Sequence, residues 1–219
     1  MRQCTIYAAT AAGASLLLGT MAMTLSGTSA VGAQGTAHSE HLHDNTVNTH
    51  LHSLNDSGAI GQAMVTVDGR KLHVRYNARR LAHGLPHAAH IHYGAEARHE
   101  CPTLRDDANH DFRINVAEGV PEYGPIAKSL TTRGDTSPDS ALAVDRFPTA
   151  KDGTVRYHRL ITAKRSVARA VRHGEGVLVI HGVDHNHNGK YDFEGAGKSE
   201  LDPKLPAEAT DPAVCGVLR

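Results

Sequence analysis

The sequence predicts an all-β protein, an antiparallel sandwich or barrel of short strands joined by long loops. Its strand-like runs are short and rich in β-branched or alternating apolar residues. Long polar segments that contain glycine and proline separate these runs, a pattern typical of such folds. The strands are expected at 61–67, 71–78, 89–92, 154–162 and 177–181, with one or two helical turns at 166–172.

The first two strands flank Asp68-Gly69, a dipeptide typical of a tight hairpin. Residues 93–152, which follow the third strand, are polar and are expected to form a long loop. Loops of more than about 15 residues without regular structure are uncommon in compact domains unless they have a function. The run 177–181 is continuously apolar up to its final histidine, which predicts a buried strand. The last 35 residues are again loop-rich and include a short apolar segment around Cys215.

The first 33 residues are predicted to be a signal peptide. Arg2 supplies a positive charge, residues 8–25 are mostly small or apolar, and Val31-Gly32-Ala33 is a small-residue cleavage site. A transmembrane anchor is the alternative, but glycines and threonines interrupt the apolar run. No other stretch is apolar enough to span a bilayer. The protein is therefore expected to be secreted or associated with the cell envelope.

Residues 34–57 are polar and rich in histidine, which predicts a disordered segment ahead of a β domain at 58–219. This segment either captures metal ions or serves as a solvated linker. Its histidines are His38, His41, His43, His50 and His52.

The charge composition excludes some classes of partner. The chain has 23 basic and 23 acidic side chains and a formal net charge of zero. Nucleic acids and anionic membrane surfaces are therefore not expected partners. Tryptophan is absent and only three phenylalanines occur, so the core must consist mainly of Val, Leu, Ile and Ala.

Two cysteines remain once the predicted signal peptide is removed, Cys101 and Cys215. An even pair in a secreted protein predicts a disulfide. Two free, buried thiols are the alternative.

Three histidines form the most informative pattern of the chain. His90 and His92 flank one isoleucine in a predicted strand, and side chains at i and i+2 of a strand project from the same face. His181 ends the apolar run 177–181. Three imidazoles on two strands predict a transition-metal site suited to copper, zinc, iron or nickel. The alternative is three unrelated surface histidines.

Two loops have oxygen donors at the spacing of a twelve-residue calcium-binding loop. The first begins at Asp107 but has Phe112 where the sharp turn favours glycine. The second begins at Asp184 and has Gly189 at that position. Its twelfth residue is Gly195, so its last carboxylate is expected from Glu194 or Glu200. The candidate calcium ligands are Asp107, Asn109, Asp111, Asn115 and Glu118 in the first loop, and Asp184, Asn186, Asn188 and Asp192 in the second.

Ordinary Asn/Asp turns are the alternative for both loops.

Several of these segments together resemble copper/zinc superoxide dismutases over about 160 residues. The similar segments are Gly84-Leu85-Pro86, His90-Ile91-His92, Val179-Ile180-His181-Gly182 and Cys215-Gly216-Val217-Leu218. Residues 89–92 and 166–181 are also similar to the related CHRD domain. The resemblance implies a Greek-key β-barrel of eight strands and a copper ion held by His90, His92 and His181. It also implies a disulfide between Cys101 and Cys215.

The sequence departs from that family at two positions tied to its activity. The bridging histidine of the zinc site has no clear counterpart, since His99 and His110 are the only histidines in the corresponding segment. Pro212 stands where the family has the arginine that attracts superoxide. Zinc is therefore not expected, and dismutase activity is expected to be weak or absent.

The sequence thus predicts a secreted metal-binding protein, with copper at the histidines and calcium in the loops. An active copper-dependent dismutase, a copper carrier and a calcium-stabilised extracellular binding or adhesion module are the alternatives.

Overall fold

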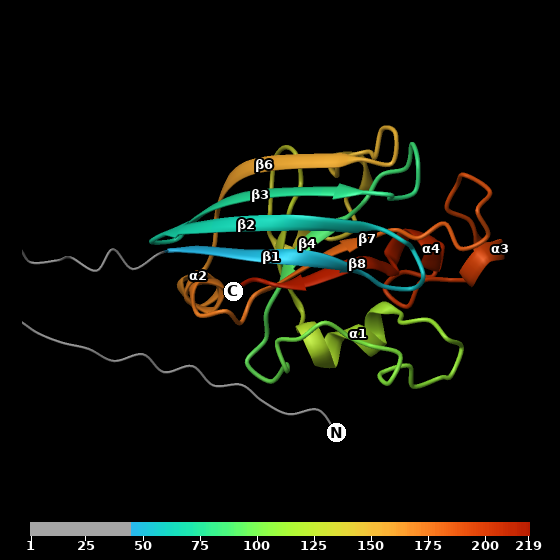
Figure 1. Ribbon diagram of the computed structural model, residues 1–219, viewed down its shortest axis with the longest axis horizontal. Coiled ribbons are helices and arrows are strands. Elements are labelled where there is room, and N and C mark those ends of the chain that lie inside the picture. The colour runs from blue at the N-terminus through green and yellow to red at the C-terminus, as the bar shows by residue number, and fades with distance from the viewer. Residues whose placement is uncertain (1–44) are drawn as a thin grey trace, which may run out of the picture. The chain divides into compact units, whose positions relative to one another are not determined.

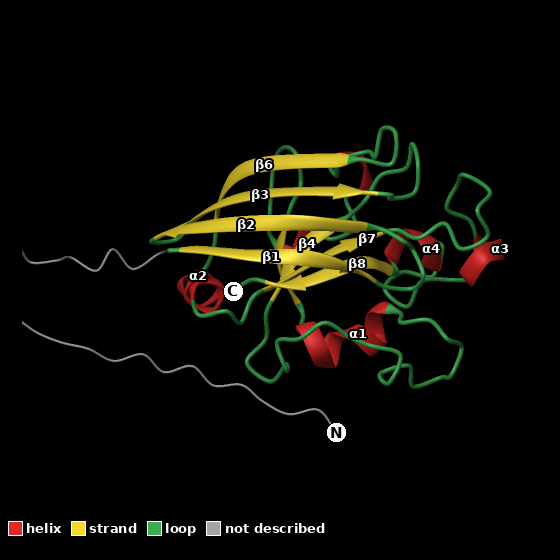
Figure 2. Ribbon diagram, in the orientation of Figure 1, coloured by secondary structure: helices red, strands yellow, loops and turns green. Residues whose placement is uncertain are grey.

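The computed structural model describes residues 45–219. The predicted signal peptide at 1–33, and the part of the histidine-rich segment before residue 45, lie outside the described residues. Eight strands and several short helices make up the described chain (Figure 2). The strands are β1 (Thr46–Ser53), β2 (Ile60–Asp68), β3 (Lys71–Arg79), β4 (Ala89–His92), β5 (Ile126–Ser129), β6 (Val155–Thr162), β7 (Val177–His181) and β8 (Pro212–Val217).

All neighbouring strands are antiparallel and form one curled sheet in the order β5-β4-β7-β8-β1-β2-β3-β6 (Figure 1). The prediction of an all-β fold is therefore confirmed. The second and third strands form the predicted hairpin, in which Asp68 pairs with Lys71. The helices are short and lie outside the sheet: α1 (Val116–Tyr123), α2 (Arg165–Arg172), α3 (Phe193–Ala196) and α4 (Ala207–Thr210).

The prediction that the domain begins at residue 58 is wrong, because β1 precedes that boundary. This strand lies in the sheet between β8 and β2 and so joins one half, β5-β4-β7-β8, to the other half, β2-β3-β6. Val47 and Leu51 are buried in the core, whereas the intervening His50 and the following His52 are exposed. The segment thus has the alternation of a half-buried strand. His50 and His52 are among the exposed residues of β1, and their polarity made the segment resemble a linker.

The prediction of an unstructured loop at 93–152 is also wrong in part. This segment contains α1, β5 and two short 3-10 helices, Pro138–Ser140 and Val144–Arg146. Helix α1 begins with a capping box, in which Asn115 accepts from the Glu118 backbone and Glu118 accepts from the Asn115 backbone. Such a short helix has little intrinsic stability, so packing against the sheet must hold it.

The main core lies on the inner, concave face of the curled sheet. Val65, Val74, Ile91 and Leu178 are completely buried there, and they come from both halves of the sheet. A second, smaller apolar cluster lies on the opposite face, where Val177, Val179 and Cys215 pack against Tyr123 of α1. The outer face of β4, β7 and β8 is therefore covered by the long loop rather than by solvent.

The predicted disulfide between Cys101 and Cys215 is confirmed, with a sequence separation of 114 residues. It attaches the long loop to β8 within the second apolar cluster. A chain-entropy model assigns about 4–5 kcal/mol to closing a loop of this length. The bridge therefore fixes the loop that covers the outer face of the sheet.

Candidate metal centre

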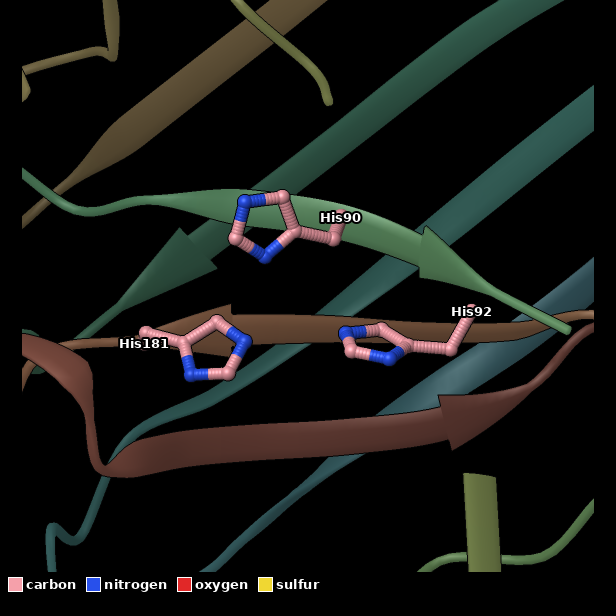
Figure 3. A group of neighbouring side chains, drawn as sticks. All are labelled: His90, His92 and His181. Atoms are coloured by element: carbon pink, nitrogen blue, oxygen red, sulfur yellow. The ribbon is translucent and has the colours of Figure 1, made fainter. Parts of the chain in front are cut away.

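The side chains of His90, His92 and His181 converge on the outer face of the sheet (Figure 3). In β4 the neighbouring residues Ala89 and Ile91 point into the core, so the alternation of the strand directs both histidines to the other face. Strand β7 is paired antiparallel with β4, with Ala89 opposite Ile180, which brings the final histidine of β7 beside them.

Each histidine contributes one ring nitrogen to the cluster, and these three nitrogens lie within 4.8 Å of one another. The ring centroids of His90 and His181 are 5.0 Å apart, and those of His92 and His181 are 5.9 Å apart. Within residues 45–219, these three form the only group of three or more His, Cys, Asp or Glu side chains whose potential ligand atoms all lie this close together. The three histidines that the sequence predicts as metal ligands therefore lie together in the fold.

The other ring nitrogen of each histidine faces a backbone carbonyl, which can only accept a hydrogen bond. His92 Nδ1 donates to Gly124 O at 2.8 Å, His181 Nδ1 donates to Thr210 O at 2.6 Å, and His90 Nε2 donates to Ala141 O at 3.2 Å. These bonds fix the tautomer and orientation of each ring, as carbonyl partners do around metal-bound histidines.

The nitrogens that remain are His90 Nδ1, His92 Nε2 and His181 Nε2. All three are buried and have no hydrogen-bond partner among the described residues. A buried polar atom without a partner costs about 1–3 kcal/mol, and three in one place are unusual in a native protein. In the neutral imidazole these atoms carry the lone pairs that bind metals, so the arrangement fits a transition-metal ion.

Burial keeps the three rings neutral. Loss of solvation lowers the pKa of His92 to about 3 and that of His181 to about 4, and it places the pKa of His90 well below its ordinary value. The proximity of the rings to one another lowers the pKa of His90 and His92 further. The site is therefore ready to accept a cation without first losing protons.

Aromatic side chains enclose two of the rings. Tyr123, the last residue of α1, lies with its ring centroid 4.4 Å from that of His92. Phe147 meets His90 edge-to-face at 5.5 Å. Both aromatic residues come from the long segment between β4 and β6, so the loop that the sequence predicts to be functional forms the wall of the site.

The first acidic loop folds around Asp107, whose two carboxylate oxygens accept from the backbone of Asp111 and Phe112 at 3.2 and 2.8 Å. Glu118 closes the loop by accepting from the backbone of Ala108 and Asn115 at 3.0 and 2.9 Å. Phe112 has a positive φ of 63°, the backbone conformation for which glycine is usual. The predicted ligand residues are therefore gathered in one compact loop.

The second acidic loop repeats these bonds position by position. Asp184 accepts from the backbone of Asn188 and Gly189 at 3.1 and 2.8 Å, and Gly189 has a φ of 83°. Asn186 accepts from Asn188 N, as Asn109 accepts from Asp111 N in the first loop.

The closing carboxylate of the second loop comes from Glu208 in α4. Its oxygens accept from the backbone of His185 and Asp192 at 2.8 Å each, the counterparts of Ala108 and Asn115. The expectation of Glu194 or Glu200 in this role is therefore wrong, because neither side chain makes these bonds. Glu208 lies in a distant segment that folds back over the loop, and no local pattern in the sequence could have identified it.

Asp211 connects the two loops with the histidine cluster. Its Oδ2 accepts from Arg113 of the first loop at 2.7 Å and from His185 of the second loop at 2.9 Å. Its backbone carbonyl accepts from Gly182, the residue after His181. The side chain is completely buried, and Oδ1 lacks a hydrogen-bond partner in the described part of the chain. Sequence analysis missed this residue.

A cavity of about 720 Å³ lies between the two acidic loops and is not lined by His90, His92 or His181. Phe112, Arg113 and His187 are among its lining residues. A small apolar cavity of about 20 Å³ is lined by His90 and His181 but not by His92.

The two histidines of the long segment between β4 and β6, His99 and His110, lie elsewhere. His99 Nε2 donates to Gly94 O and its ring stacks on Tyr93, whereas His110 is exposed in the first acidic loop. Neither belongs to the three-histidine group within the described chain.

Comparison with protein-family models and with curated proteins finds no match to this chain. None of the helices described in residues 45–219 is long and apolar enough to cross a membrane.

Proposed function

We propose that this protein binds one copper ion through His90, His92 and His181. The observation that supports this most strongly is the set of three buried ring nitrogens that converge without hydrogen-bond partners. Their counterpart nitrogens are oriented by carbonyl oxygens, so the ligands are already in place before an ion arrives.

Copper is favoured over other ions by the ligands and by the resemblance to copper/zinc superoxide dismutases. All three candidate ligands are neutral imidazoles, and copper binds such sites more strongly than the neighbouring divalent metals. When bound, copper supplies one-electron redox chemistry. Zinc also accepts three imidazoles, so metal competition must distinguish the two.

We propose further that superoxide dismutation is weak or absent. Fast turnover of an anion requires a positive field that guides it to the metal. Pro212 occupies the position at which the resembling family has its guiding arginine, and Arg113 is paired with Asp211. An active copper-dependent dismutase remains the alternative, and superoxide assays of the copper-loaded protein distinguish the two.

Calcium binding in the two acidic loops is a second proposal. The supporting observation is that two loops far apart in the sequence share two features. Both have a positive φ at their sixth position, and both are closed by a carboxylate that accepts hydrogen bonds from the same two backbone positions. Carboxylate, amide and carbonyl oxygens are the ligands that calcium prefers. The disulfide and the predicted signal peptide support secretion, and calcium is abundant outside the cell.

Metal competition on the full-length protein tests the copper proposal. The protein is exposed to equal amounts of copper and zinc, washed with a weak chelator and analysed for retained metal. We expect about one copper per chain in the wild type and none in a His92→Ala, His181→Ala variant. The matched control is His50→Ala, His52→Ala, which removes an exposed pair of the same spacing on β1. Copper retained by the first variant, or lost from the control, would reject the site.

A further inference from the structure

The outer face of β1, β2, β3 and β6 carries a hollow of about 500 Å³. These four strands lie side by side in the sheet (Figure 1). Residues such as Val65 and Val74 point into the core, so the alternation of each strand directs the residues between them outward. The side chains of the hollow are therefore presented by a rigid sheet rather than by a loop.

The strand register arranges these outward side chains in rows across the sheet. One row consists of four polar residues, each opposite the next on the neighbouring strand: His50, Gln62, Asn77 and Arg156. All four line the hollow and are exposed. With strands about 4.8 Å apart, such a row spans about 14 Å.

The formal charges in the hollow are all positive. They belong to Arg156 and to Arg75, which lies opposite His158, two residues from Arg156 on the same strand. Within residues 45–219, no Asp or Glu lines the hollow, and neither arginine forms an ion pair. A guanidinium without a counter-charge is suited to bidentate binding of a carboxylate.

The zero net charge of the chain does not describe this face. The acidic side chains of the two loops, such as Asp107 and Asp184, lie outside the hollow and balance its arginines only in the sum. A local positive potential attracts anions whatever the net charge is.

The neutral side chains of the hollow are mainly carboxamides. Asn48, Gln62 and Asn77 line it together. Each carboxamide offers both a hydrogen-bond donor and an acceptor, and a hydroxyl group requires both. Two arginines among three carboxamides therefore match a ligand that carries carboxylates and hydroxyls at once.

The hollow lacks the features that would favour a nucleic acid or a membrane. Among the described residues that line it, Tyr76 is the only Phe, Tyr or Trp; it is 4% exposed, and its ring stacks on Tyr157 in the core. Single-stranded bases thus find no platform for stacking. Met64 is its one exposed large apolar side chain, whereas binding in a membrane interface relies on a broad apolar face.

We propose that this hollow binds an acidic oligosaccharide. Arg75 and Arg156 hold the carboxylates of the sugar, and the carboxamides hold its hydroxyl groups. The site is separate from the histidine cluster and from the acidic loops, so it requires neither copper nor calcium.

Isothermal titration calorimetry of the full-length protein with a hexamer of galacturonic acid tests this proposal. A chelator is present, so that no metal ion can bridge the sugar carboxylates to the acidic loops or to the histidines. We expect the hexamer to bind, and its methyl ester, the same sugar without charge, to bind at least about tenfold more weakly. A peptide of six glutamates, which has carboxylates but no hydroxyl groups, should also bind more weakly.

The Arg75→Gln, Arg156→Gln variant should lose about tenfold or more in affinity for the hexamer. The matched control is Arg105→Gln, Arg172→Gln, which removes the same charge at two exposed arginines outside the hollow and should bind like the wild type. Thermal melting checks that both variants are folded.

Absence of hexamer binding, or equal affinity in the wild type and the Arg75→Gln, Arg156→Gln variant, would overturn the proposal. Equal affinity for the methyl ester would rule out the role of the arginines. Equal affinity for the glutamate peptide, or tighter binding of an oligothymidylate of the same charge, would reject an acidic sugar as the ligand.

Discussion

The carboxylate of Glu208 occupies the space beside Gly195 into which a side chain at the twelfth position of the second acidic loop would project. In the first loop that position is Glu118, whose own carboxylate makes the equivalent bonds. A β-carbon at position 195 would collide with the carboxylate of Glu208 in this position, and glycine leaves the space free for it. The closing carboxylate therefore comes from within the first loop, whereas in the second loop it comes from the distant helix α4.

Replacement of this closing carboxylate should remove the response of the second loop to calcium. A ligand that binds only the folded state at a hundredfold excess over its Kd adds about 2.7 kcal/mol to the free energy of unfolding. We expect calcium to raise the melting temperature of the wild type, and we expect this increase to be smaller in Glu208→Gln. Glu194→Gln and Glu200→Gln are the controls and should respond like the wild type. The same reduction in all three variants would contradict the assignment of Glu208.

Loss of the charge on Asp211 should destabilise the fold strongly. The carboxylate is completely buried and pairs with Arg113 and His185, so Asp211→Asn leaves the guanidinium of Arg113 without its main counter-charge. Breaking a buried pair in this way costs about 3–5 kcal/mol. Urea unfolding measures the loss. The control is Asp145→Asn, which breaks an exposed pair with Arg133 and should change the free energy of unfolding little. Equal effects of the two variants would show that Asp211 does not connect the loops.

Most strands could be predicted from the sequence because their periodicity is local. Strands β2, β3, β4, β6 and β7 have buried residues in the alternating or continuous pattern that marks them. Strand β1 escaped detection because its outward-facing positions include two histidines of a segment that resembled a linker. Strand β5 has only four residues and depends on pairing with β4 rather than on a strong pattern of its own.

The candidate metal ligands could be predicted because alternation in a strand fixes the face of His90 and His92. The atoms that orient the three histidine rings could not be predicted. They are the backbone carbonyl oxygens of Ala141, Gly124 and Thr210, and every residue has such an oxygen. Asp211 and Glu208 were missed for a related reason: their roles depend on which loops the tertiary fold brings to them.

The metal-free protein should lose stability as the pH falls below about 6.5. Burial lowers the pKa of His181 to about 4 and that of His92 to about 3, below the ordinary value of 6.5. The unfolded chain therefore takes up protons that the folded chain does not bind. The stability contributed by neutral burial is present above pH 6.5 and is lost as the pH falls towards the folded pKa.

Each histidine should contribute a slope of up to about 1.4 kcal/mol per pH unit across this interval. Urea unfolding at a series of pH values, with a chelator present, measures the slope. His92→Leu should reduce it, whereas His50→Leu, at an exposed position of β1, should not. An unchanged slope in His92→Leu would mean that this ring is protonated in the folded protein.

X-ray absorption on the copper-loaded, full-length protein tests the proposed three-histidine site most directly. Weakly bound metal is first removed with a chelator, and the number of imidazole ligands is obtained from the scattering pattern around the copper. The account predicts one copper per chain with three imidazoles at about 2.0 Å, and loss of that copper in His90→Ala, His92→Ala, His181→Ala. Copper retained by this triple variant with an unchanged imidazole count would contradict it.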